Sequence, residues 1–143
     1  MATLWRTDAT LEVMRERCRN TLAEYLGIEL TELGADYLTG TMRVDHRTCQ
    51  PMRLLHGGAS VALAETLGSL AANAANRDPE RHFVGQEINA NHLRPVPEGG
   101  LVIGTARPFH IGASSQVWGI ELVNEQAKRI CVARITMAAV KKS

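Results

Sequence analysis

The spacing of apolar positions changes along the chain and predicts where helices give way to strands. Over residues 8–26 the apolar side chains recur three or four positions apart, at Leu11, Met14, Cys18, Leu22 and Tyr25. This spacing places them on one helical face, so one or two short helices are predicted, capped by Asp8 or Thr10. Two strands are predicted next, over residues 28–33 and 37–44, joined by a turn at 34–36.

One long helical segment and four further strands follow. The apolar run over residues 54–76 predicts the helix, with the pair Gly57-Gly58 opening it and residues 76–79 ending it. The later strands are predicted at residues 82–94, 101–111, 115–123 and 129–140. Their short connections predict antiparallel neighbours. Such a sheet must bury its apolar face against the one long helix, which predicts an α+β fold.

The long helical segment is unusual because Glu65 is its one charged residue. A helix on a solvated surface normally has a charged face, so this helix is predicted to be wrapped by the sheet or by a partner chain. An unpaired carboxylate is costly to bury, so Glu65 is predicted to be paired, hydrogen-bonded or functional. Ser69 and Asn73 continue the same face at steps of four. The alternative is that these three residues form an ordinary solvent-exposed stripe.

Length and composition restrict the class of protein. The 143 residues, 45% of them apolar, are expected to form a single domain over 1–143. A net charge of +1 argues against a nucleic-acid partner. The start, MATLWRTDATLEVMRER, lacks the apolar core of an export signal, and no apolar stretch is long enough for a membrane span. Three cysteines without a CxxC pair, and no HExxH, argue for a cytoplasmic protein that uses no metal or cofactor.

The start of the long helix offers acyl-transfer chemistry. A helix N-terminus has unpaired N–H groups and a positive dipole end, and at Gly57 no side chain blocks approach. The Gly57 N–H is therefore a candidate donor to a carbonyl oxygen that becomes an oxyanion, with the Gln50 amide as a second donor. A carboxylate on the opposite side would attack the carbonyl or activate water. Because thiolate is a good leaving group, a thioester suits a site without a serine triad.

Helix geometry separates His56 from Glu65, which are nine positions apart. That spacing corresponds to about 13 Å and half a turn, so one helix cannot bring both to the same carbon. Two such helices running antiparallel about a two-fold axis can do so. If His56, Gly57 and Glu65 are all catalytic, the protein is therefore a homodimer with two composite sites.

Four segments in order resemble a known family. They are VDHRTCQP (44–51), HGGASVALAETLGS (56–69), GQEINANHLRP (85–95) and HIGASSQVW (110–118). They resemble the hotdog-fold acyl-CoA thioesterases, in particular the bacterial branch with 1,4-dihydroxy-2-naphthoyl-CoA thioesterase and the proofreading thioesterase of enterobactin synthesis. The similarity covers residues 4–140. It implies an antiparallel sheet curled around one central helix, a dimer that pairs two sheets edge to edge, and usually a homotetramer.

The resemblance also implies roles for individual residues. Glu65 corresponds to the nucleophile or general base, and Gln50 with the Gly57 N–H to the pair that polarises the carbonyl. His56 corresponds to the residue that supports the leaving thiolate, and Ser69 to the one that positions water. The residues implied to bind the acyl-CoA substrate are Gly85, His92, Leu93, Arg94, Pro95, His110, Ile111, Gly112, Ala113, Ser114 and Ser115.

Two segments depart from the family pattern. The family commonly has Phe-Gly where this chain has Met52-Arg53, which leaves the shape of the acyl pocket open. The family often has an arginine in the loop that here reads Ala113-Ser114-Ser115, which weakens the expected phosphate contacts. Arg94 or Arg107 are the candidates to replace it.

The function predicted is hydrolysis of acyl-CoA, or of acyl groups on a carrier protein, with an aromatic or medium-chain acyl group. The alternative is a non-catalytic acyl-CoA sensor on the same fold. A hydratase is disfavoured because His56 precedes the glycines and has no nearby Asp to pair with. A Cys49 nucleophile is disfavoured because no matching motif surrounds it.

Overall fold

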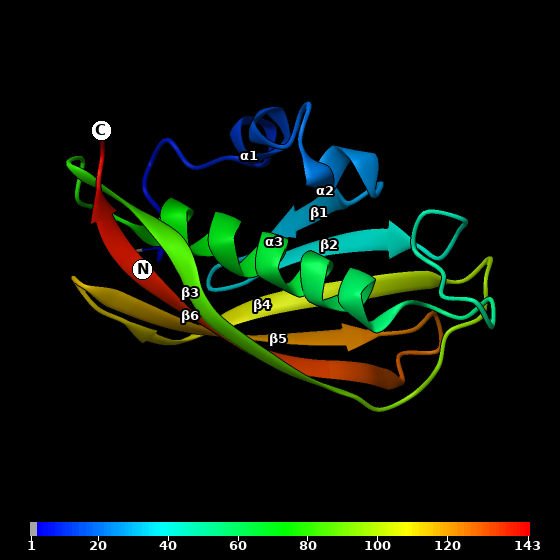
Figure 1. Cartoon of the computed structure of the whole chain (residues 1–143). Helices are drawn as coiled ribbons and strands as arrows, with labels where there is room; N and C mark the ends of the chain where they lie inside the picture. Colours follow the sequence, from blue (N-terminus) through cyan, green and yellow to red (C-terminus); the bar gives the residue numbers. More distant parts are fainter. Residues whose placement is uncertain (1–2) are drawn as a thin grey trace.

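Six strands form one antiparallel sheet, and a 19-residue helix lies across one of its faces (Figure 1). The computed structural model describes residues 3–143. The elements in chain order are α1 (Leu11–Arg17), α2 (Leu22–Tyr25), β1 (Glu29–Leu33), β2 (Leu38–Arg43), α3 (Gly57–Ala75), β3 (Arg81–His92), β4 (Leu101–Ile111), β5 (Ser115–Val123) and β6 (Arg129–Lys141). The predicted α+β class and the predicted helices and strands are confirmed.

The helix ends lie where their capping chemistry predicts. The Thr10 hydroxyl accepts a hydrogen bond from the Val13 N–H at 3.2 Å and begins α1. His56 is the N-cap residue of α3, and Asn76 follows its last turn. No helix within residues 3–143 is both long enough and apolar enough to cross a bilayer.

The strand order is β1-β2-β4-β5-β6-β3, which corrects one prediction. β3 and β4 are not neighbours, although they follow each other in sequence. β3 instead pairs with β6, from Arg81↔Lys141 to His92↔Cys131. The connection over residues 93–100 is longer than a hairpin turn. It pairs with the segment before α3, because Leu54 and Pro97 form a β-bridge. β3 therefore lies at one edge of the sheet and β1 at the other.

The sheet wraps around α3, as the scarcity of charge predicted. Leu63, Ala64, Leu67 and Ala71 on α3 are fully buried. Helix and sheet approach closely, because a Cβ on Gly68 would lie 2.7 Å from the Ile135 side chain. The N-terminal segment completes the core, where the Trp5 and Trp118 rings stack with centroids 5.9 Å apart.

Candidate active site

The N-terminus of α3 leaves one backbone donor free. The Gly58 N–H donates to His56 Nδ1 at 2.8 Å, and the N–H groups of Ala59 and Ser60 donate to the His56 carbonyl at 3.0 and 3.2 Å. The Gly57 N–H has no acceptor among residues 3–143. Because Nδ1 of His56 accepts, the neutral imidazole carries its proton on Nε2. The positive end of the helix therefore presents one unpaired N–H and one imidazole donor.

Gln50 lies in a tight turn just before this helix. Its N–H donates to the Leu54 carbonyl at 2.8 Å, and its carbonyl accepts from the Arg53 N–H at 2.9 Å. The Met52 N–H donates to the side-chain oxygen Oε1 of Gln50. Since an N–H faces that oxygen, the amide nitrogen is left as a donor.

Gly57 and Gln50 line a pocket of about 390 Å³, and His56 is not among its lining residues. The pocket is lined by Gln50, Leu54, Leu55, Gly57, Ser60, His92, Leu93, Arg94, Pro95 and Ile130. A Cβ on Gly57 would lie 2.9 Å from Nε2 of His92, so only glycine leaves room for this imidazole over the start of the helix. The structure therefore brings together Gln50, Gly57 and the segment 92–95.

Ser60 is a pocket residue that the sequence reasoning missed. It is polar but only 2% exposed, and it lines the same pocket as Gly57. The signal was its spacing, because residues three apart share a helical face. A hydroxyl about one turn after the glycine predicted to donate to the substrate is therefore a candidate for substrate contact.

The Glu65 carboxylate lies against β3. A Cβ on Gly85 would lie 2.1 Å from Oε2 of Glu65, so the carboxylate occupies the space that any side chain at 85 would fill. The strand is irregular here, with a register shift between Gly85 and Glu87. The Glu65 side chain is partly buried, and it makes no hydrogen bond or salt bridge with residues 3–143. An acidic group without a protein partner fits a role in chemistry better than one in stability.

Glu65 and Asn73 contact β3, and all three residues Glu65, Ser69 and Asn73 are half-buried, so they do not form an ordinary solvent-exposed stripe. The Asn73 amide donates to the Phe83 carbonyl at 2.9 Å and accepts from the Phe83 N–H at 2.8 Å. The Ser69 hydroxyl lies 3.9 Å from the sulfur of Met137. Asn73 therefore fastens α3 to the edge strand β3.

One chain does not assemble all the predicted catalytic residues. Glu65 is not among the residues that line the pocket of Gln50 and Gly57. Along α3 it lies about 12 Å from Gly57, at about 1.5 Å per residue. Within one chain, Glu65 at the middle of α3 is therefore separate from the pocket of Gln50 and Gly57 at its N-terminus.

The segment 110–115 lies at the opposite end of the helix from Gly57. Ile111, Gly112 and Ala113 line a hollow of about 470 Å³ together with residues 75–78 at the C-terminal end of α3. The turn is closed by a hydrogen bond of 2.9 Å from the Gly112 N–H to the Ser115 carbonyl. Within one chain the structure therefore does not join this segment to the pocket of His92.

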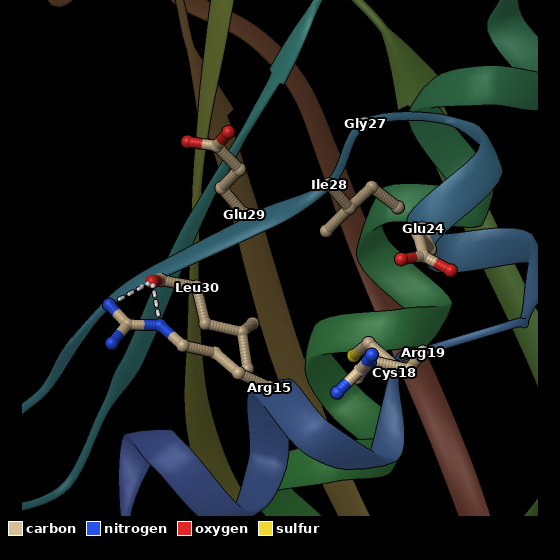
Figure 2. A pocket seen from close by; sticks show the side chains of 8 residues that line it. All are labelled: Arg15, Cys18, Arg19, Glu24, Gly27, Ile28, Glu29 and Leu30. Atoms are coloured by element: carbon tan, nitrogen blue, oxygen red, sulfur yellow. Dashed lines mark hydrogen bonds between the residues drawn. The ribbon is translucent and has the colours of Figure 1, made fainter.

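A hollow of about 480 Å³ between α1, α2 and β1 holds none of the predicted site residues (Figure 2). The Arg15 guanidinium donates two hydrogen bonds to the Leu30 carbonyl, at 2.8 and 3.2 Å. This contact covers backbone of an edge strand. Burial raises the pKa of the Cys18 thiol, which makes it a poor nucleophile. The side chains around this hollow therefore have a structural role, in which Arg15 protects the edge strand β1.

Comparison with known proteins decides the family. Residues 52–131 match the family model of the thioesterase superfamily. The proofreading thioesterase EntH of Cronobacter turicensis is 49% identical over 135 residues, which covers 94% of this chain and 97% of that protein. The chain belongs to the thioesterase superfamily.

Solved thioesterase structures share its fold over nearly the whole chain. A thioesterase of Haemophilus influenzae is 45% identical with a TM-score of 0.92, and covers 97% of this chain and 96% of its own. A mutant thioesterase of Pseudomonas aeruginosa is 42% identical with a TM-score of 0.93, and the match covers 98% of this chain and 100% of that one. The predicted hotdog fold and the predicted thioester hydrolase activity are confirmed.

Proposed function

We propose that this thioesterase hydrolyses acyl-CoA with an aromatic or medium-chain acyl group, in sites shared between two subunits. The observation that carries the proposal is that Gly57, whose N–H has no acceptor among residues 3–143, lines one pocket with Gln50. An acyl group on a carrier protein is the other proposed form of the same substrate. Both forms present the same thioester carbonyl to the site.

In the proposed reaction the thioester oxygen accepts hydrogen bonds from the Gly57 N–H and from Nε2 of Gln50. These donors stabilise the negative charge that grows on the oxygen, and the helix dipole adds to their effect. Glu65 of the partner subunit attacks the carbonyl carbon or takes a proton from the attacking water. If Glu65 attacks, the carbon–sulfur bond breaks as an anhydride forms, and water then hydrolyses this anhydride to release the acid and restore the carboxylate. If Glu65 acts as the base, the water oxygen adds to the carbonyl carbon and the carbon–sulfur bond breaks directly. In both routes the leaving thiolate takes up a proton that comes from the water, so the products are the acid and the thiol. Nε2 of His56 faces the leaving sulfur as a donor, and Ser69 positions the water.

The free edge of β3 supports the proposed dimer. An edge strand presents unpaired backbone groups, and pairing two copies of β3 about a two-fold axis satisfies them. Glu65 already lies against β3 at Gly85, so its carboxylate is close to that edge. Such pairing sets the two α3 helices antiparallel. The Gln50–Gly57 pocket of one subunit would then face the Glu65 carboxylate of the other.

The resemblance also supports a tetramer of two such dimers, which we propose as the full assembly. It would cover the outer face of the sheet, where Phe109 is 67% exposed.

The coenzyme A arm is proposed to follow residues 92–95. Arg94 is the proposed phosphate contact, because one of its nitrogens donates to the Arg129 carbonyl and fixes the guanidinium beside the pocket. Three free thiols support a reducing, cytoplasmic location.

The substitution Glu65→Gln tests this function. It keeps the size of the side chain but removes the nucleophile or base, so we expect kcat to fall by about 10²- to 10⁴-fold. The measurement is thiol release from a panel of benzoyl-, naphthoyl- and aliphatic acyl-CoA. Glu121→Gln is the matched control, because Glu121 lies on β5 and forms only an exposed salt bridge with Arg129.

Unchanged kinetics in Glu65→Gln would refute the proposed role of this carboxylate. If the unsubstituted protein binds acyl-CoA and releases no thiol from any member of the panel, the sensor alternative holds for these ligands. Release of thiol from aromatic or medium-chain members in preference to short ones would support the proposed substrate class.

A further inference from the structure

Arg53 adopts a backbone conformation that favours glycine. Its φ is +61°, in the left-handed region, where a residue with a Cβ is held at a cost and glycine is not. Arg53 belongs to the turn of Gln50, which is closed by the bond from the Arg53 N–H to the Gln50 carbonyl. Strained backbone persists only where its surroundings hold it, and such positions gather at functional sites.

Glu98 is what holds Arg53. The Arg53 guanidinium contacts both carboxylate oxygens of Glu98, with Nε to Oε1 at 3.3 Å and a second, shorter contact to Oε2. The backbone adds a bond of 3.1 Å from the Glu98 N–H to the Arg53 carbonyl. Planar two-point pairing of this kind fixes geometry more strongly than a single contact between point charges.

This turn also sets the direction in which the Gln50 side-chain amide points. The Met52 N–H, one residue before Arg53, donates to Oε1 of Gln50. If the turn relaxes at Arg53, this N–H moves away from Oε1 and the amide becomes free to rotate. Gln50 would then present its nitrogen to the pocket for only part of the time.

We propose that Arg53 and Glu98 are a positioning pair that keeps the Gln50 amide nitrogen aimed into the pocket beside the Gly57 N–H. The inference rests on the proposed function of Gln50 as a donor to the thioester carbonyl. Neither member of the pair contacts the substrate. Their effect belongs to the transition state, because an oxyanion donor acts most strongly when charge has developed on the oxygen.

The test compares Arg53→Ala, Glu98→Ala and Arg53→Gly in thiol release from acyl-CoA. Arg53→Ala keeps the strained backbone and loses the guanidinium, and Glu98→Ala loses the other partner. We expect each to lower kcat by about 5- to 20-fold and to change KM by less than about twofold. Arg53→Gly is expected to stay within about threefold of the unsubstituted protein, because glycine adopts this φ without strain. Glu121→Ala is the matched control for loss of an exposed ion pair.

A double-mutant cycle with Gln50→Ala separates positioning from a general structural effect. If Arg53 acts through Gln50, adding Arg53→Ala to Gln50→Ala lowers kcat by less than about twofold further. An equal loss in both backgrounds, or unchanged kcat in Arg53→Ala and Glu98→Ala, overturns the positioning pair alone. If Gln50→Ala itself leaves kcat unchanged, the proposed function of Gln50 fails and the positioning pair fails with it. Thermal unfolding checks that each variant folds. If Arg53→Ala does not fold, Glu98→Ala still tests the proposal, because it leaves the residues of the turn unchanged.

Discussion

Two glycines leave room for side chains that the proposed site uses. A Cβ on Gly57 would lie 2.9 Å from the His92 imidazole, and one on Gly85 would lie 2.1 Å from the Glu65 carboxylate. In both places the absent side chain lets a polar group approach backbone closely. Each glycine therefore shapes the proposed site through the side chain that it lacks.

Gly85→Ala should displace the Glu65 carboxylate without unfolding the chain. The new methyl would overlap Oε2, and a glutamate can move away through its flexible side chain at little cost to stability. We expect kcat for acyl-CoA hydrolysis to fall by at least about tenfold, because small misplacements of a catalytic group are costly. Gly119→Ala on β5 is the matched control, since its methyl would meet only the exposed Phe109 ring, at 2.4 Å. Equal kcat in the two variants would contradict the proposed position of Glu65.

At the scale of elements, the segment that leads into α3 is anchored by Asp45 and Arg47. Arg47 donates to the Asp45 carboxylate at 2.7 Å and to the Tyr25 carbonyl at the end of α2 at 2.6 Å. The Arg47 guanidinium holds the pKa of Asp45 down at about 2, and both side chains are partly buried. The anchor fixes the start of the segment that carries Gln50 and His56.

Asp45→Asn should lower stability in a pH-dependent way. The folded-state pKa of Asp45, about 2, lies below its ordinary value of 3.8. The stabilisation from its charge is therefore present above pH 3.8 and is lost as the pH falls toward 2. At pH 7 we expect a loss of about 1 kcal/mol in the free energy of unfolding, reduced from the full linkage value because solvent screens the pair. Urea unfolding at pH 7 and near pH 3 measures this, and a difference that stays constant or grows toward low pH would contradict the account.

Element bounds were predictable because they depend on local chemistry. The capping hydroxyl of Thr10 and the glycine pair at residue 57 mark helix starts that the structure confirms. The place of β3 at the sheet edge was not predictable in the same way. Strand order depends on which tertiary contacts hold the long connection over residues 93–100, and spacing along the chain carries no signal of the Leu54–Pro97 bridge.

At the scale of the whole molecule, Glu65 and the Gln50–Gly57 pocket are separate within one chain. The sequence predicted their separation, because residues such as His56 and Glu65 lie too far apart on one helix to meet. It also named the group of Gln50, Gly57 and His92 that lines one pocket. It could not place the segment 110–115, which lies at the other end of α3. The pairing of Arg53 with Glu98 was equally hidden, since it joins two loops that are distant in sequence.

Mixing two inactive variants tests the shared site most directly. Glu65→Gln and Gln50→Ala are unfolded and refolded together in equal amounts, and thiol release is compared with that of the unsubstituted protein treated in the same way. If each site takes Gln50 from one subunit and Glu65 from the other, half of the dimers are mixed, and one of the two sites in each is intact. We predict recovery of about one quarter of the unsubstituted activity. Activity no higher than the average of the two variants refolded alone would contradict the account.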